Sequence, residues 1–160
     1  MPARLSPAQR TKFLSGRHVA VLVTNGIDGH PVPTPIWYLY RDGTFYFRTE
    51  RDAIKTKNVL RDPRVSVCVQ EERAPYKAVI AYGTAEVRNA IDWMKEMPRH
   101  YLGVIGGIGY QQTAQEAIQQ GPEVALVMQV ERCTSFDFAS DVPLFAKAWL
   151  LAKRFLPPWL

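Results

Sequence analysis

The chain has 160 residues, of which 47% are hydrophobic and 22% charged, as expected for a single globular domain with a core of its own. These values exclude a disordered chain, a collagen-like chain and a disulfide scaffold. Lysine and arginine number 20 and aspartate and glutamate 15, which gives a formal net charge of +5. This balance favours anionic ligands but does not identify one.

The two cysteines, Cys68 and Cys133, lie far apart in the sequence and lack metal-ligand spacing. We interpret them as free thiols in a reduced compartment, with a disulfide as the alternative. Residues 1–10 are polar and contain two prolines, unlike a signal peptide, and no segment reaches the ~20 apolar residues of a membrane span. The sequence therefore predicts a cytoplasmic protein.

The first part of the chain predicts two helices and three strands. A capping box at Ser6–Gln9, with proline at the first helical position, predicts the first helix. Three strands should follow, at 18–24, 32–40 and 44–49. The second strand contains three prolines, which cannot donate to a central ladder, so it should lie at a sheet edge or be bulged. Residues 52–61 predict a helix capped by Asp52, with three apolar contacts, Ile54, Val59 and Leu60.

The second part of the chain predicts four more strands and two helices. The strands lie at 65–69, 76–87, 124–130 and 134–138, and the helices at 89–101 and 111–120. Gly83 should mark a bulge, and the glycine-rich segment 103–109 a flexible loop. Because no βαβ alternation is present, we expect a mainly β (α+β) fold, an antiparallel barrel with peripheral helices.

Residues 1–140 form the expected domain, and residues 141–160 a C-terminal helix and tail. Apolar residues at helical spacing from Pro143 to Phe155 predict an amphipathic basic helix, which Pro157 and Pro158 end. We expect this helix to dock on protein, because three cations are few for a helix on a membrane surface. Contact with a membrane is therefore not expected.

The strongest candidate for a binding site is the segment 48–64, which holds six basic and three acidic residues. A predicted strand ends here and a predicted helix begins, and helix N-termini favour anions. Lys55 in the first turn would add a full positive charge. The segment predicts a phosphate site, and the alternative is a solvated basic helix face that pairs with Glu50 and Asp62.

A second candidate is the segment 33–37, where prolines free a strand edge and Trp37 and Tyr38 supply flat surface. A planar heteroaromatic ligand needs such a slot, and the alternative is that Trp37 belongs to the core. No Rossmann or P-loop motif is present. The three histidines, His18, His30 and His100, lack metal-ligand spacing, so no metal site is expected. The basic segment lacks the interleaved aromatic residues of a nucleic-acid binder.

The motifs form an ordered set, which comprises 19–24, 28–31, 34–38, 42–47, 55–58, 62–67, 75–76 and 83–86, with later elements at 100–103 and 132–138. This set resembles the flavin- and deazaflavin-dependent oxidoreductases of the pyridoxamine 5'-phosphate oxidase-like split-barrel superfamily, over about residues 13–138. The resemblance implies a six-stranded antiparallel split β-barrel. It also implies an obligate homodimer with two cofactors in grooves between the subunits.

The resemblance also implies which residues bind the cofactor. Lys55 matches the phosphate-binding lysine of the family, and Lys57 and Asn58 lie beside it. The remaining matches are the wall along the isoalloxazine ring (Thr34, Pro35, Ile36, Trp37), the strand end beside the phosphate-bearing chain (Arg48, Thr49) and the segment that the second subunit offers (Pro75, Tyr76, Lys77). Many members carry another basic residue where this chain has Ala53, so Arg51 or Lys57 would have to compensate.

The implied activity is hydride transfer between FMN or coenzyme F420 and a small organic substrate, with chemistry supplied by the cofactor. The Lys-Thr-Lys-Asn and Asp-Pro-Arg-Val-Ser motifs favour F420, whose anionic tail suits a basic surface. No residue is identified as catalytic, and Tyr76, His100 and Tyr101 are the candidates for an acid or base. The alternatives are a non-enzymatic carrier of flavin, haem or a tetrapyrrole, with a histidine as the axial ligand for haem, and a nucleic-acid-binding barrel. We expect no nucleic-acid partner.

Overall fold

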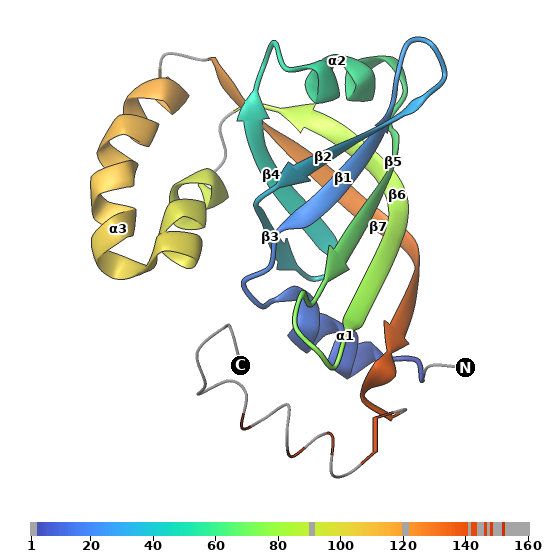
Figure 1. The fold of residues 1–160 in the computed structure, drawn as a ribbon. Helices are drawn as coiled ribbons and strands as arrows, with labels where there is room; N and C mark the ends of the chain where they lie inside the picture. The colour runs from blue at the N-terminus through green and yellow to red at the C-terminus, as the bar shows by residue number, and fades with distance from the viewer. Residues whose placement is uncertain are drawn as a thin grey trace.

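A computed structural model describes residues 3–89, 92–119, 122–140, 142–143, 146, 148 and 152, with the backbone alone at 111–119 and 140. It contains seven strands, which are β1 (Ala20–Asn25), β2 (Pro31–Ile36), β3 (Tyr38–Arg41), β4 (Thr44–Glu50), β5 (Arg64–Gln70), β6 (Lys77–Arg88) and β7 (Glu123–Asp137). All pair antiparallel in the order β2-β1-β5-β6-β7-β4-β3, and the sheet curls into a half-barrel (Figure 1).

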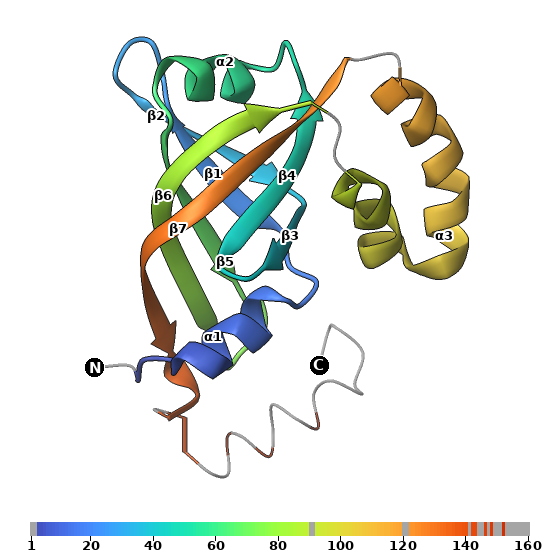
Figure 2. The same cartoon turned by 180° about the vertical axis from the view of Figure 1, so that it is seen from behind.

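Three α-helices within the described residues surround the sheet, and they are α1 (Pro7–Leu14), α2 (Ile54–Arg61) and α3 (Trp93–Gln119). Helices α1 and α2 lie at opposite ends of the barrel, and α3 stands beside β3 and β4 (Figures 1 and 2). A short 3-10 helix, Phe138–Ser140, follows β7. No helix among the described residues is both long and apolar enough to span a membrane. The predicted helix from Pro143 to Phe155 falls largely outside the described residues.

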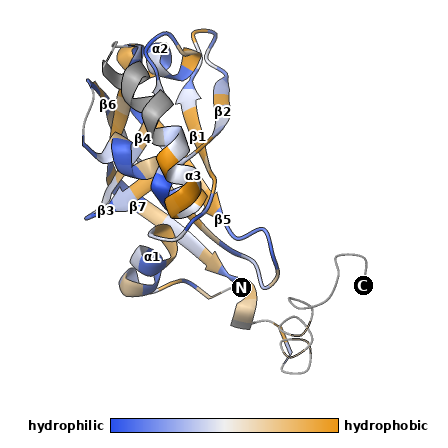
Figure 3. Cartoon of the chain, turned by 90° about the vertical axis from the view of Figure 1, so that its left-hand side faces the viewer, coloured by the Kyte–Doolittle hydropathy of each residue, from blue (hydrophilic) through white to orange (hydrophobic). Residues whose placement is uncertain are grey.

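Side chains alternate between the core and the outer face of the barrel, as the strand patterns predict. In β4, Phe45 and Phe47 are fully buried, whereas Tyr46 and Arg48 lie partly exposed on the other side. The same alternation buries Leu22, Val67, Val69, Val79 and Met128, and hydropathy changes along the strands accordingly (Figure 3). Burial of apolar side chains from all seven strands forms one continuous core.

The predicted strand 32–40 is two strands, because the chain breaks at Trp37. The structure has seven strands, whereas the resemblance implies six. Strand β2 pairs only with β1, so its prolines occupy an edge as predicted. Strands β2 and β3 are consecutive in the chain but lie at opposite edges of the sheet. Trp37 therefore lies where the chain crosses the open seam of the half-barrel.

The long pair β6·β7 contains the predicted bulge at Gly83. Tyr82 pairs with Arg132 and Gly83 with Val130, so the extra residue is Glu131 on β7. A Cβ atom on Gly83 would lie 1.8 Å from the carbonyl oxygen of Gln129, which explains the glycine. The prediction of two strands at 124–130 and 134–138 is wrong, since the bulge allows one continuous strand, β7, to pass residue 131.

Helix α1 begins as predicted, with both hydrogen bonds of the capping box between Ser6 and Gln9. Helix α2 differs from the prediction, because its N-cap is Ala53 and no side chain caps it. Ile54 and Leu60 are exposed. The packed face of α2 instead joins two polar residues, Thr56 and Asn58, to Val59, the one predicted apolar contact that is buried.

Hydrogen bonds compensate for this polar face of α2. The Thr56 hydroxyl donates to the Glu50 carbonyl oxygen (2.7 Å), and Asn58 Nδ2 donates to Thr24 Oγ1 on β1 (3.0 Å). Buried polar groups with such partners carry little penalty. Because Thr56 and Asn58 are polar, the spacing of apolar residues in α2 does not reveal that they face the barrel.

The expected flexible loop at 103–109 is helical. Only Gly103 departs from helical geometry, with φ 73° and ψ −173°, and it separates two helical segments of α3. A Cβ atom on the buried Gly107 would lie 2.7 Å from Arg99 Cα, so this glycine permits close packing of the two segments. Gly107 is therefore explained by the close approach of its backbone to Arg99, and not by a loop.

Candidate functional site

A cavity of about 250 Å³ lies beside Trp37. It joins three of the predicted ring-wall residues, Pro35, Ile36 and Trp37, to Arg48 on β4. The other lining residues are Met97, Pro98, Tyr110 and Glu123, and all but Glu123 belong to α3. The contribution of α3 was not predicted, because nothing in the sequence indicates that this helix stands against the end of β2. Thr34 is half-buried on β2, opposite Leu22.

The aromatic wall of the cavity is held by Tyr101. Its ring stacks on that of Trp37, with centroids 4.6 Å apart and planes 3° apart. Its hydroxyl donates to the His18 carbonyl oxygen (2.7 Å), lies 3.0 Å from the Tyr38 carbonyl oxygen and accepts from the Tyr38 N–H (3.0 Å). Burial raises the pKa of Tyr101 to about 12. A phenol in this environment is protonated at neutral pH and fixes the backbone beside Trp37.

The two other candidates for an acid or base differ from Tyr101. Tyr76 is 56% exposed. His100 is partly buried, with Nε2 3.4 Å from the Gly16 carbonyl oxygen. None of the three candidates, Tyr101 included, is among the residues that line the cavity beside Trp37.

Arg48 is ion-paired within this cavity. Its Nε and Nη2 atoms lie 2.5 Å and 2.8 Å from the carboxylate oxygens of Glu123. Both side chains are largely buried, and the bidentate geometry fixes the guanidinium group. The guanidinium carbon lies 5.6 Å from the centre of the Tyr110 ring. This wall of the cavity therefore contains a neutral ion pair next to the aromatic ring of Tyr110. The adjacent Thr49 is buried.

The first turn of α2 lies just beyond the end of β4. Thr56 binds the carbonyl oxygen of Glu50, two residues after Arg48, and this bond ties α2 to the strand that lines the cavity. Lys55 is half-buried and Lys57 is exposed. Within the described part of the chain, neither amino group makes a hydrogen bond or ion pair. The uncapped helix N-terminus and these lysines form a cationic end that suits an oxyanion.

The alternative interpretation, a basic face paired with Glu50 and Asp62, fits Arg64 and not the lysines. Arg64 Nη2 lies 2.7 Å from Asp62 Oδ2. Asn58 is occupied within the fold, because its amide donates to Thr24 and its Oδ1 accepts from Arg61. Of the predicted trio at 55–58, the two lysines therefore remain for a ligand.

The segment Pro75–Lys77 lies far from this cavity, at the end of the barrel beside α1 (Figure 1). Pro75 and Lys77 line another cavity with Lys12, His18 and Arg73. Lys77 Nζ lies 3.7 Å from Asp137 Oδ2. Within a single chain, this predicted part of the site and Lys55 therefore lie at opposite ends of the barrel.

Neither a metal site nor a disulfide is present among the described residues. No group of three or more histidine, cysteine or acidic side chains could hold a metal ion there. Both cysteines are free. Cys68 lies on β5 opposite Ile80 and Cys133 lies on β7 opposite Ala81, so strand β6 separates them. The interpretation of two thiols is confirmed.

The family model described as pyridoxamine 5'-phosphate oxidase matches residues 6–137, from the cap of α1 to the end of β7. The chain belongs to this family. The matched residues contain the whole sheet and the cavity beside Trp37. The prediction of a split-barrel fold is therefore confirmed. No curated protein sequence matches the chain significantly.

Solved structures share this oxidase-family fold at low sequence identity. A conserved hypothetical protein, Rv2991, from Mycobacterium tuberculosis has a TM-score of 0.73 and 23% identity, with 87% of this chain and 89% of that chain covered. A FAD-binding protein from Mesorhizobium loti has a TM-score of 0.61 and 23% identity, with 84% and 95% covered. An F420 reductase has a TM-score of 0.56 and 15% identity, with 76% and 93% covered.

Proposed function

We propose that this protein is an oxidoreductase that transfers hydride between FMN or coenzyme F420 and a small organic substrate. One juxtaposition carries the proposal. The aromatic cavity beside Trp37 and the cationic first turn of α2 meet at the end of β4, where Arg48 lines the first and Glu50 anchors the second. A flavin-type cofactor combines a flat ring with a phosphate-bearing chain, and these two surfaces match its two parts.

The residues present fit such a cofactor. Trp37 supplies a flat wall that Tyr101 keeps in place, and the free edge of β2 leaves backbone groups beside it. Lys55 and Lys57 offer amino groups for a phosphate, and Ala53 leaves the helix N-terminus uncapped. When bound, the ring accepts or gives a hydride. The protein binds and orients it, and the neutral Arg48–Glu123 pair leaves the ring wall without net charge.

Similar structures support a flavin-type cofactor, since one is described as FAD-binding and another as F420 reductase. The Lys-Thr-Lys-Asn motif and the basic surface favour F420 over FMN. The proposed substrate is a small organic molecule that stacks against the ring.

The proposal includes a homodimer with shared cofactor grooves. A cavity of about 250 Å³ is smaller than most ligand pockets, which start near ~300 Å³, so a further wall is needed. Large apolar side chains are exposed at the end of the β6·β7 ladder, where the Phe138 N–H donates to the Tyr76 carbonyl oxygen. We define this exposed apolar cluster as Tyr76, Phe136 and Phe138. A second copy that covers it would bring its own Pro75–Lys77 segment towards the groove.

The test is a fluorescence titration of the full chain with FMN and with F420, combined with the visible spectrum of the protein as purified. We expect saturable binding of one cofactor and a spectrum that changes on reduction of the complex by a substrate or dithionite. A spectrum of bound haem would favour the carrier alternative. Absence of binding to both cofactors would overturn the proposal.

A further inference from the structure

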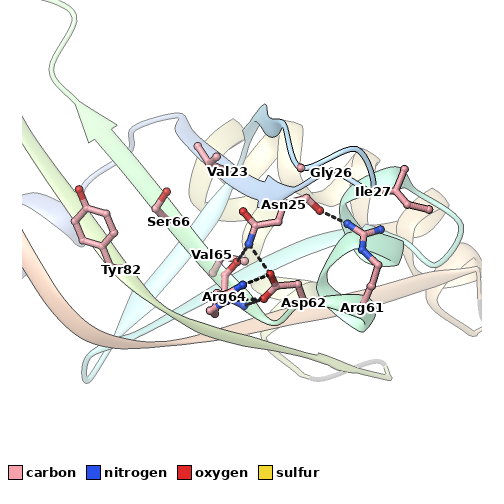
Figure 4. Close-up of a pocket in the computed structure, with 11 residues that line it drawn as sticks. Val23, Asn25, Gly26, Ile27, Arg61, Asp62, Arg64, Val65, Ser66 and Tyr82 are labelled. Atoms are coloured by element: carbon pink, nitrogen blue, oxygen red, sulfur yellow. Dashed lines mark hydrogen bonds and ion pairs between the residues drawn. The ribbon is translucent and has the colours of Figure 1, made fainter.

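A larger cavity, of about 490 Å³, lies at the opposite end of α2 from Lys55. It is formed by the turn between β1 and β2, the last residues of α2 and the outer face of β5 and β6 (Figure 4). Lys55 and Arg61 are six residues apart along the helix, which corresponds to ~9 Å. None of its lining residues belongs to the cavity beside Trp37, so the two cavities are separate.

One wall of this cavity is fixed by the carboxylate of Asp62. It accepts hydrogen bonds from Arg64 Nε (2.9 Å) and Nη2 (2.7 Å), from the Arg64 N–H (3.1 Å) and from Asn25 Nδ2 (2.9 Å). The bonds from Arg64, with that from Asn25, hold the pKa of Asp62 well below its usual range. The carboxylate is therefore ionised and saturated with donors, and its role is to hold Asn25 and Arg64 in position.

The guanidinium groups keep donors for a ligand. Arg61 Nη2 donates to the Asn25 carbonyl oxygen and to Asn58 Oδ1 (3.3 Å). A guanidinium carries five N–H donors. Within the described residues, Nη1 of both arginines and Nε of Arg61 make no hydrogen bond. Two cations and one saturated carboxylate line the cavity, which therefore favours an oxyanion.

The rest of the lining combines the flat ring of Tyr82 and apolar side chains with the polar side chains of Asn25 and Ser66. Figure 4 shows Tyr82 at one end of the cavity and Ile27 beside Arg61 at the other. The guanidinium carbon of Arg132 lies 3.8 Å from the centre of the Tyr82 ring and holds that ring in place. Ile27 is 87% exposed on the turn, so its side chain is accessible to a ligand in the cavity.

We propose that this cavity is a second ligand site, which binds a flat aromatic compound that carries a phosphate or carboxylate group. Arg61 and Arg64 bind the oxyanion, and the apolar body lies against Val23 and Tyr82. A cavity of this volume accommodates one such ligand. The site is independent of the proposed cofactor groove, since it uses neither Lys55 nor Trp37.

Binding of 1-naphthyl phosphate to the full chain, measured by isothermal titration calorimetry, tests this site. The probe should bind, and 1-naphthol and inorganic phosphate should each bind at least about tenfold more weakly, because each lacks one of the two recognised parts. Equal binding of 1-naphthol would overturn the role of the oxyanion. Absence of binding of the probe would overturn the site.

Variants locate the bound probe. Arg61→Gln should weaken binding about tenfold or more, and the matched control Arg88→Gln, an exposed arginine paired with Glu86, should not change it. Because Arg61 also holds the turn, Ser66→Phe provides a second variant, which fills the cavity without a change of charge. Lys55→Ala should leave probe binding unchanged. If Lys55→Ala abolishes probe binding while Arg61→Gln and Ser66→Phe retain it, the probe occupies the cofactor groove, and this proposal fails while the proposed function stands.

Discussion

Tyr101 and Trp37 stack with their rings 3° from parallel, and the Tyr101 hydroxyl joins the two sides of the barrel seam. It contacts the backbone of His18, just before β1, and that of Tyr38, the first residue of β3. Because β2 and β3 lie at opposite edges of the sheet, no ladder joins them. A side chain from α3 therefore sets the position of the aromatic wall.

Tyr101→Phe should destabilise the fold by about 1–3 kcal/mol, because the His18 carbonyl oxygen and the Tyr38 N–H lose a hydrogen-bond partner while the ring stack remains. Urea unfolding followed by tryptophan fluorescence measures this change. Tyr110→Phe is the control, since its hydroxyl makes no hydrogen bond with a described residue. Equal stability of the Tyr101 variant and the parent would show that the seam does not depend on this hydroxyl.

Stability should fall at alkaline pH through Tyr101. Its folded pKa is about 12, whereas a free tyrosine has a pKa of about 10. As pH rises, the unfolded chain loses this proton first, so the contribution to stability is complete below about pH 10 and is lost between about pH 10 and 12. The difference in unfolding free energy between parent and Tyr101→Phe should narrow across this interval. A constant difference would contradict the shifted pKa.

Lys55→Ala should weaken cofactor binding by one to two decades, because a charge-assisted hydrogen bond contributes roughly 1.5–3 kcal/mol. The fold should be unchanged, since the Lys55 amino group makes no hydrogen bond or ion pair with another described residue. Fluorescence titration with FMN and F420 measures the affinity. Arg88→Gln, at an exposed arginine paired with Glu86, is the control for the loss of one charge. Unchanged affinity in Lys55→Ala would remove this lysine from the site.

Gly83→Ala should destabilise the protein by more than about 3 kcal/mol or prevent folding, since the new Cβ atom would lie 1.8 Å from a backbone oxygen in β7. Gly109→Ala is the matched control. Its Cβ atom meets nothing within 4 Å, and it lies in α3, so the same substitution should stabilise by about 0.5–1 kcal/mol. Thermal and urea unfolding of the two variants measure both effects. Similar stabilities would contradict the bulge geometry.

Light scattering should give the mass of two chains at micromolar concentrations, because the exposed apolar cluster would otherwise remain in water. The double variant Tyr76→Ser with Phe138→Ser should shift the mass towards one chain. Ile27→Ser, at a more exposed apolar position at the other end of the barrel, should not. The mass of one chain for the parent protein at all these concentrations would reject the shared groove.

Local patterns in the sequence predicted the features that depend on neighbouring residues. Alternation in the strand separates Phe45 and Phe47, which the structure buries, from Tyr46 and Arg48 on the other face. The capping box started α1, and the isolated glycine at position 83 marked the bulge. The prolines of β2 predicted an edge strand, because a missing N–H donor excludes a central position wherever the strand pairs. The ordered motifs predicted the family, which the model match over residues 6–137 supports.

Contacts between segments far apart in the sequence determine the other features of the fold and the site. The spacing of neighbouring residues does not predict such contacts. Arg48 finds Glu123, 75 residues away, and Trp37 finds Tyr101, so the ring wall depends on where α3 and β7 return to the barrel. The packed face of α2 is polar because Thr24 and Glu50 supply hydrogen-bond partners. The glycines after residue 103 form a helix because Gly107 packs against Arg99, whereas composition alone indicates a loop. The local sequence determines which side chains each strand presents to the core. The tertiary structure decides which distant groups provide the hydrogen-bond and ion-pair partners of the polar side chains.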